Sequence, residues 1–540
     1  MKVNQTTTKL NNSHVIASLV EAKQSRKRNG EEIASSQTPR NDVVSFTNAG
    51  IAGAAILRAL EVSPAWGAVA TDIASMTGPR TIIDFIERGP NMGLETGRQQ
   101  GSSTLNHAFI GFYGAGAGLL LSGAFGLNKV KGHKVFASTD VLNKFKKAFE
   151  DTKDADETFK KVLGDTEAIL ADGTKKKLSE IEGLVGDAFT AYQDKKPQLY
   201  AKHLIMKATG SESNYKLTEK SVLSLNEFVD NLFSITDTLK SSKVQNDAGK
   251  FFKSMKNFGL ARSALGLGIA SAIGLSMQPL NMYLTRRKTG SDGFTGVKGR
   301  KKDKSAGFTM FKTILGAAGL IGVLASISRK PAELLTKLQF KGMVPTLSQF
   351  KLVYGLTIAS RFLSARDKDE LREATVRDTI GFLSWLVFGG FVTRGVVKVM
   401  DKSLMKESWD GKGFFKSTLV TRDEIVHNAL NQIPGVDTFK NGKEIPFKEL
   451  MKELNKHVQT SEIARTAKKQ LSITSIGQLS GYAFSCIVLG ILLQKLNIHM
   501  TKKSEERRQA KLAAEHQVPN ETNTTIVGLL KPQISDIIKK

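Results

Sequence analysis

The sequence predicts an all-α fold, a multi-span helical membrane protein with a charged helical extramembrane domain. Three features predict this class. Several apolar runs are about as long as a bilayer requires, a charged stretch of helical pattern separates two of them, and the densest basic segments lie next to apolar runs. With 540 residues, the chain has room for more than one domain.

The net positive charge of the chain restricts the classes of partner that it can bind. The chain has a formal net charge of +27, which requires an anionic partner, a membrane surface on the basic side, or both. Proteins that bind nucleic acid usually mix basic residues with exposed aromatic residues on a soluble domain. The basic runs here flank apolar runs instead. Anionic lipid headgroups are therefore the expected partner, and nucleic acid is not expected.

Three uncharged runs are the strongest candidates for membrane spans, at residues 108–127, 263–284 and 470–494. Each is about long enough to cross the hydrocarbon core. Pro279 predicts a kink near the end of the second run. In a soluble protein each run would have to form a wholly buried helix, which is uncommon at this length. We therefore expect all three to lie in lipid.

Four further runs, at 43–57, 313–328, 352–360 and 379–393, are weaker because they are shorter or lie next to charges. The run at 352–360 is bracketed by Lys351 and Arg361, which is also typical of an amphipathic helix in the membrane interface. Arg361 and Arg394 lie near the expected ends of weak spans, where a long side chain can reach the headgroups.

These runs divide the chain into segments of alternating character. In chain order the prediction is a polar N-terminal segment at 1–42, an apolar helical region at 43–127 that ends in a span, a charged helical extramembrane domain at 128–257, a multi-span region at 258–400, a smaller polar domain at 401–469, a span at 470–494 and a basic tail at 495–540. In the charged domain, Val141, Phe145 and Phe149 lie on one helical stripe. The first forty residues lack the apolar core of a signal peptide, so insertion would use internal spans.

A basic loop at 285–306 is the expected contact with lipid. Its candidate headgroup ligands are Arg286, Arg287, Lys288, Arg300, Lys301, Lys302 and Lys304. Each basic residue beside a span gains about 1 kcal/mol at an anionic surface. If the runs at 313–328, 352–360, 379–393 and 470–494 all cross, this loop and the basic tail share the cytoplasmic side, and the charged domain lies opposite.

Small residues recur at every fourth position in the three strong runs, and this pattern predicts close helix packing. The three stripes are Gly114, Gly118, Ser122 and Gly126, then Ala264, Gly268, Ala272 and Ser276, and finally Gly477 and Gly481. Ordinary packing in a bundle is the simpler interpretation. The same faces could line a transport pathway, or join copies of this chain or other chains into an oligomer.

No motif indicates an enzyme, a cofactor or a metal site. The eight histidines are scattered, and the GAGAG at 114–118 lacks a nucleotide-binding context. The single cysteine, Cys486, excludes an intrachain disulfide. Charged residues follow the turn at 77–80, namely Asp84, Glu87, Arg88, Glu95 and Arg98. We expect them to form pairs on a helix surface.

These patterns favour a non-enzymatic scaffold or assembly component that binds anionic lipid through its basic loop and tail. A channel or transporter with its pathway along the small-residue faces is the alternative. A membrane-bound enzyme without a recognisable motif is the third hypothesis, because distant segments can assemble a site that no sequence pattern displays. The expected location is a bacterial inner membrane, with a mitochondrial inner membrane as the second possibility.

Overall fold

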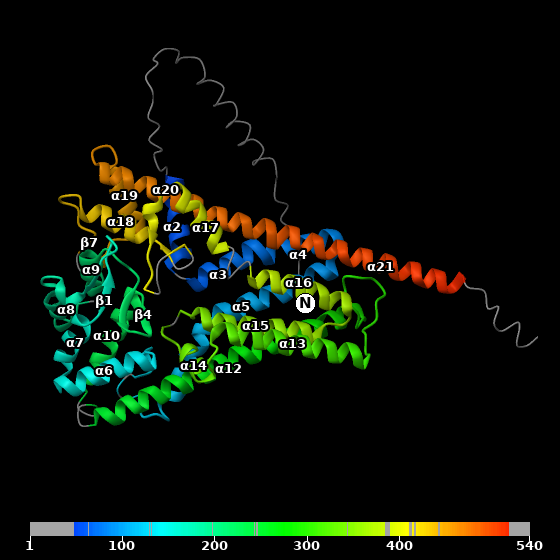
Figure 1. The fold of residues 1–540 in the computed structure, drawn as a ribbon, viewed down its shortest axis with the longest axis horizontal. Helices are drawn as coiled ribbons and strands as arrows, with labels where there is room; N and C mark the ends of the chain where they lie inside the picture. The colour runs from blue at the N-terminus through cyan, green and yellow to red at the C-terminus, as the bar shows by residue number, and fades with distance from the viewer. Residues whose placement is uncertain are drawn as a thin grey trace, which may run out of the picture. The chain divides into compact units, whose positions relative to one another are not determined.

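A computed structural model describes residues 48–517, except 63, 129, 131, 197, 242–243, 245–246, 343, 384–388, 410–412, 415–416 and 441–442. It is about 75% helical, so the predicted all-α class holds (Figure 1). The predicted polar segment at 1–42 and the end of the basic tail lie outside the described residues. The described chain consists of a helical bundle, a peripheral domain and a second polar segment.

The bundle contains the longest helices. Its elements are α2 (Asn48–Val62), α3 (Pro64–Asp72), the π-helical η1 (Ile73–Thr77), α4 (Gly78–Arg88), α5 (Pro90–Ser122), α12 (Ala248–Thr289), α13 (Ala306–Ile327), α14 (Pro331–Lys337), α15 (Leu347–Ser364), α16 (Lys368–Leu383), α17 (Gly389–Met400), α20 (Glu462–Ser485), the π-helical η6 (Cys486–Leu492) and α21 (Leu493–Gln517). The closest pairs are α5 with α12, α13 with α15, and α17 with α20.

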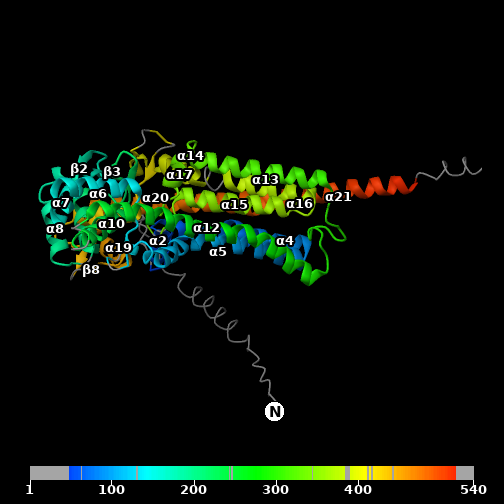
Figure 2. The ribbon, with the colours of Figure 1, turned by 90° about the horizontal axis from the view of Figure 1, so that it is seen from below.

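Successive helices run back and forth between two ends of the bundle. Near the start of α13, Lys312 donates to the carbonyl of Ala365 after α15, and near the start of α15, Lys351 donates to Ser326 near the end of α13. These two helices are therefore antiparallel, and Figure 2 shows them side by side. We call the end with the loop at 290–305 the basic end, and the end next to the peripheral domain the domain end.

Three helices in the described part of the chain are long and apolar enough to cross a membrane. They are Ala248–Thr289, Ala306–Ile327 and the continuous helix Glu462–Glu515. These contain the strong candidates at 263–284 and 470–494 and most of the weaker run at 313–328. The third strong candidate, 108–127, is not among them. Its helix α5 ends at Ser122, because Gly123 and Gly126 follow and Gly126 adopts a positive φ of 67°.

The weaker run at 352–360 lies between two of the long helices. It lies inside α15, which packs against both α12 and α13. Val353, Ile358 and Phe362 are buried there. A helix that contacts neighbours on two sides belongs to the bundle interior. The run at 379–393 is interrupted by residues outside the described part, so its status as a single span stays a prediction.

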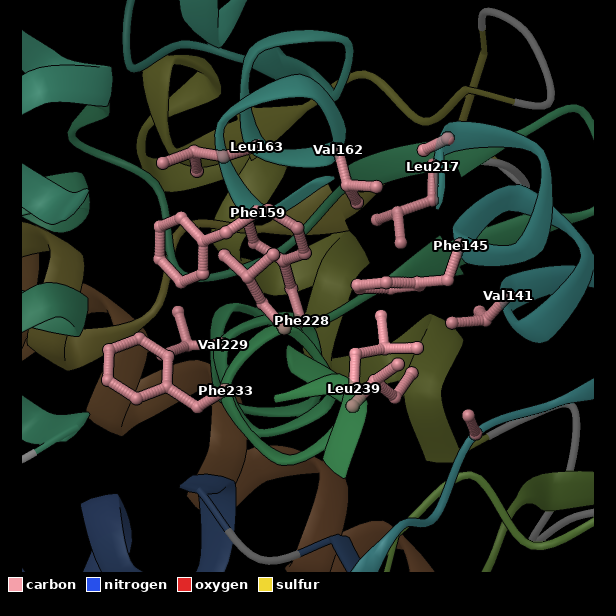
Figure 3. Packing of buried hydrophobic residues seen from close by; sticks show 14 of the residues in the cluster. Val141, Phe145, Phe159, Val162, Leu163, Leu217, Phe228, Val229, Phe233 and Leu239 are labelled. Atoms are coloured by element: carbon pink, nitrogen blue, oxygen red, sulfur yellow. The ribbon is translucent and has the colours of Figure 1, made fainter. Parts of the chain in front are cut away.

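The peripheral domain extends from residue 127 to residue 258 and has its own apolar core. Its helices are η2 (Gly132–Lys134), α6 (Thr139–Thr152), α7 (Ala155–Gly164), η3 (Leu178–Glu180), α8 (Leu184–Gln193), α9 (Gln198–Thr209) and α10 (Leu225–Leu239). Figure 3 shows Phe145, Phe159 and Phe228 converging in this core. The predicted stripe of Val141, Phe145 and Phe149 is buried on α6. The core ends on α12, which continues into the bundle without a break.

A small antiparallel sheet, which the helical pattern did not predict, completes the peripheral domain. Its described strands are β1 (Glu167–Ile169), β2 (Lys175–Lys177), β3 (Tyr215–Thr218) and β4 (Ser221–Leu223), in the order β2-β1-β3-β4. Ala168 pairs with Lys176 on one side and Tyr215 on the other. Strands of three or four residues are too short for an alternating pattern to be recognised.

The second polar segment, residues 401–461, packs on the peripheral domain. It contains η5 (Lys402–Leu404), β5 (Met405–Lys406), β6 (Thr418–Leu419), α18 (Arg422–Asn431), β7 (Phe439–Lys440), β8 (Lys443–Glu444) and α19 (Phe447–His457). Trp409 donates its indole N–H to the carbonyl of Asn214 at 2.8 Å, and Asn428 donates to Gly210 at 3.1 Å. The two polar regions therefore meet at the same end of the bundle.

Candidate functional site: a buried network of ion pairs

Helix α4 has its polar and apolar faces exchanged relative to a helix of a soluble protein. Arg80 and Asp84 are only 2% and 0% exposed, whereas Ile82 and Ile86 are 58% and 78% exposed. The apolar face thus points outward and the charged face points into the bundle. The interior that receives it must supply partners, since an unpaired buried charge is very costly.

The innermost pairs join α15 and α16. Arg361 contacts Asp378 at 2.8 Å, and Arg377 contacts the same carboxylate oxygen at 3.2 Å. Arg361 also donates to the carbonyl of Gln99 on α5. Arg80 donates to the carbonyl of Leu489 in η6 at 3.0 Å. Four helices, α4, α5, α15 and α16, and the π-helical η6 therefore meet around these arginines.

A second group of pairs joins α4, α16 and α21. Arg88 forms a bidentate pair with Glu373, with contacts of 2.5 and 2.9 Å. Asp84 accepts hydrogen bonds from Thr96 and from Gln494, the latter at 2.8 Å. Bidentate guanidinium–carboxylate pairs combine strength with a fixed geometry. This group fixes the register of α4 against α16 and α21.

The outermost pairs lie at the basic end. Arg366 contacts Glu95 at 2.5 Å and Glu370 at 2.8 Å. Arg300, from the basic loop, contacts three carboxylates, those of Asp367 at 3.2 Å, Asp369 at 2.8 Å and Glu505 at 2.8 Å. Because Glu505 belongs to α21, the basic loop and the start of the basic tail lie together.

The surface location predicted after the turn at 77–80 is therefore wrong for Asp84, Arg88 and Glu95, which are bound to other helices inside the bundle. The predicted i to i+4 contact is present between Asp84 and Arg88, at 3.7 Å and buried. Arg361 likewise does not extend to a headgroup, because its partner Asp378 is buried beside it. Only tertiary packing supplies these partners. The available signal was the pattern of α4, in which charges at every fourth position alternate with four apolar residues, Ile82, Ile83, Phe85 and Ile86.

The seven predicted headgroup ligands do not share one environment. Arg286, Arg287, Lys288, Lys301, Lys302 and Lys304 are exposed at the basic end. The guanidinium of Arg300 is held in the network. Lysines and arginines on the outer side of α21 are also exposed, at Lys495, Lys502, Lys503, Arg507 and Arg508.

The three predicted small-residue stripes also differ in how far they contact neighbouring helices. On α5, Gly114 lies against Phe340 and Gly118 against Arg262, with Ser122 buried nearby, whereas Gly126 is exposed in the turn after the helix. On α20, Gly477 lies against Val397 of α17, and Gly481 is buried. On α12 the predicted residues Ala264, Gly268, Ala272 and Ser276 are exposed, and the contacts come from the neighbouring stripe of Ser263, Gly266, Ala270 and Gly274. Packing of the exposed stripe on another chain stays a prediction.

No family model, curated protein or solved structure matches this chain. Within the described residues, no group of three or more histidine, cysteine, aspartate or glutamate side chains is arranged to hold a metal ion. The buried ion-pair network is thus the chemical feature that a functional hypothesis must explain. It can fix the bundle in one register, or it can conduct or bind protons and small ions.

Proposed function

We propose that this chain is an integral membrane protein that acts as a scaffold, with its basic end on an anionic leaflet. The observation that carries this proposal is the exchange of faces in the bundle, where ion pairs lie inside and large apolar side chains lie outside. The exposed apolar residues include Ile82, Ile86, Phe109, Phe112, Leu119, Leu120, Met310, Phe311, Ile314, Ile321, Ile476, Leu479, Ile487 and Leu492. Lipid is the solvent that such a surface requires.

Helix length supports the same proposal. Helix α13 has 22 residues, and at a rise of about 1.5 Å per residue it is about 33 Å long. The hydrocarbon core of a bilayer is about 30 Å thick. The loop that precedes α13 contains the exposed basic residues. An anionic headgroup layer at that end would neutralise them, as expected for the cytoplasmic leaflet of a bacterial inner membrane.

The first test measures membrane residence and orientation. Replacing Arg286, Arg287, Lys288, Lys301, Lys302 and Lys304 with glutamine should leave the chain in carbonate-washed membranes but produce mixed orientations, seen as partial protease protection of the peripheral domain. The matched control replaces six exposed lysines of that domain, Lys147, Lys153, Lys176, Lys177, Lys195 and Lys220. It should keep a single orientation. Release of the native chain by carbonate would refute membrane residence, and a single orientation of the loop variant would refute the role of the basic end.

A second candidate function, transport of protons or small ions through the bundle, is favoured by the network itself. Charged residues within membrane helices are costly and usually mark a pathway. The ion pairs extend from Arg300 at the basic end to Asp378 between α15 and α16, so charged side chains follow one another through the interior of a bundle whose exterior is apolar. A scaffold requires packed helices but does not require a series of buried charges.

Flux in sealed vesicles separates the two functions. The purified chain, reconstituted in vesicles that contain a pH-sensitive dye, should dissipate a proton gradient if it transports. Asp378→Asn should then reduce the rate at least tenfold, while Asp165→Asn in the peripheral domain should not. The double variant Arg361→Gln with Asp378→Asn controls for misfolding. It removes the cation together with its partner carboxylate, so it leaves fewer unpaired charges in the bundle than Asp378→Asn alone. A native chain that carries no proton current would refute transport and leave the scaffold.

A further inference from the structure

A small cavity lies deep in the bundle, where α3, η1, α5 and α15 meet. It is lined by Asp72, Thr104, His107 and Tyr354, and by the apolar side chains of Val69, Met76 and Phe350. Its volume of about 20 Å³ is enough for one water molecule, which needs at least two polar partners to be stable there. The lining supplies those partners.

Two of the lining groups are ionisable. The carboxylate of Asp72 accepts a hydrogen bond from the hydroxyl of Thr104, and within the described residues it forms no ion pair. His107 is 7% exposed, and its ring lies 5.5 Å from that of Tyr354 and 6.2 Å from that of Phe350. Its Nε2 atom has no hydrogen-bond partner in the described part of the chain. A buried nitrogen that no protein group partners can accept a hydrogen bond from a water molecule in the adjacent cavity.

The backbone beside the cavity departs from the regular α-helix. Asp72 directly precedes the π-helical η1, and η1 packs on the second π-helical segment, η6. Gly490 of η6 approaches the carbonyl of Ser75 so closely that any side chain would collide. Single π-helical turns within α-helices occur often at functional sites. The site and this contact therefore belong to one local arrangement.

The cavity lies at the inner end of the ion-pair network. Arg80 on α4 and Arg361 on α15 both act electrostatically on the carboxylate of Asp72, and Asp378 on α16 lies against Arg361. Arg361 also acts on the imidazole of His107 and favours its neutral form. Toward the domain end, the interior changes to an apolar cluster that includes Ile110, Leu267, Phe340 and Val353. Polar groups thus connect the cavity to the basic end, and apolar side chains separate it from the domain end.

We propose that Asp72 and His107, bridged by one water molecule, form a proton-binding site that exchanges protons with the basic end along the ion-pair network. A proton from bulk solvent would be held by the carboxylate of Asp72, with the neutral imidazole of His107 accepting a hydrogen bond from the water, and its return to solvent would restore the starting state. A divalent metal ion is the poorer occupant, because two ionisable side chains and hydroxyl groups are fewer and weaker ligands than such ions use. This inference rests on the second proposed function.

The test is an infrared titration of the full chain in lipid nanodiscs. A carboxyl band should appear on acidification, vanish in Asp72→Asn and shift in His107→Gln. The variant His499→Gln, which changes an exposed histidine of α21, should leave it unchanged. Thr104→Val keeps both ionisable groups and removes one hydrogen bond to the carboxylate. It should move the midpoint of the band to higher pH by about one unit.

A band that persists in Asp72→Asn, or one that Thr104→Val does not move, would overturn the site. The flux assay gives the separate answer on transport. A native titration without proton flux would retain the site and refute the function, whereas flux that survives in both Asp72→Asn and His107→Gln would retain transport and refute the site.

Discussion

Single glycines set the distance between neighbouring helices. A Cβ atom at Gly266 of α12 would lie 2.9 Å from the Cα atom of Gly114 on α5, and one at Gly355 of α15 would lie 2.7 Å from Val323 on α13. A backbone neighbour cannot rotate away as a flexible side chain can. The contact between α5 and α12 is therefore the less tolerant of the two.

Two glycines of α12, two positions apart, give a matched pair of variants. Gly266→Ala should destabilise the chain by about 1 to 3 kcal/mol, because the backbone of α5 must shift. Gly268→Ala should be neutral or stabilising by up to about 1 kcal/mol, because nothing lies within 4 Å and alanine favours the helix. Thermal unfolding in detergent measures both. Equal changes in stability in the two variants would contradict the packing of α5 against α12. A loss of stability in Gly268→Ala alone would show that the exposed stripe packs on another chain.

At the scale of the element, each long helix has two environments along its length. The first half of α5 buries polar side chains such as Glu95, Gln99 and Thr104, and its second half buries Ile110, Gly114 and Ala117. Helix α12 begins in the core of the peripheral domain with Phe251 and Phe252, then enters the bundle and ends at the exposed basic residues. These helices therefore connect regions that the sequence pattern treats as separate segments.

At the scale of the whole described molecule, an acidic cluster joins α2, the peripheral domain and the second polar segment. Asp423 forms a bidentate pair with Arg58 of α2, and Glu424 pairs with Lys406 at 2.7 Å and accepts the backbone N–H of Glu212. Burial, together with the neighbouring carboxylates of Asp423 and Glu424, raises the pKa of Glu212 well above its ordinary value of 4.5. The folded chain therefore binds this proton more tightly than the unfolded chain does.

This raised pKa predicts a pH dependence of stability. The favourable contribution of protonated Glu212 is fully present below pH 4.5 and is lost as the pH rises toward the raised pKa, at about 1.4 kcal/mol per pKa unit. Glu212→Gln should therefore unfold at a higher temperature than the native chain at neutral pH, with the difference shrinking on acidification. The exposed Glu180→Gln serves as the control. A neutral-pH melting temperature of Glu212→Gln at or below the native value would refute the assignment.

The sequence by itself determined the helical class, because the length and period of apolar runs depend only on local composition. It also indicated all three helices able to cross a membrane, two as strong candidates and one as a weaker run, and the exposed basic loop. It did not predict where α5 ends or the small sheet, since strands of three residues carry no usable period. Tertiary structure alone decided which face of α12 packs and which charges are buried. Asp84 and Arg361 look like surface residues in sequence. Only partners on other helices, such as Gln494 and Asp378, make their burial possible, because a buried charge is stable only where another segment pairs with it.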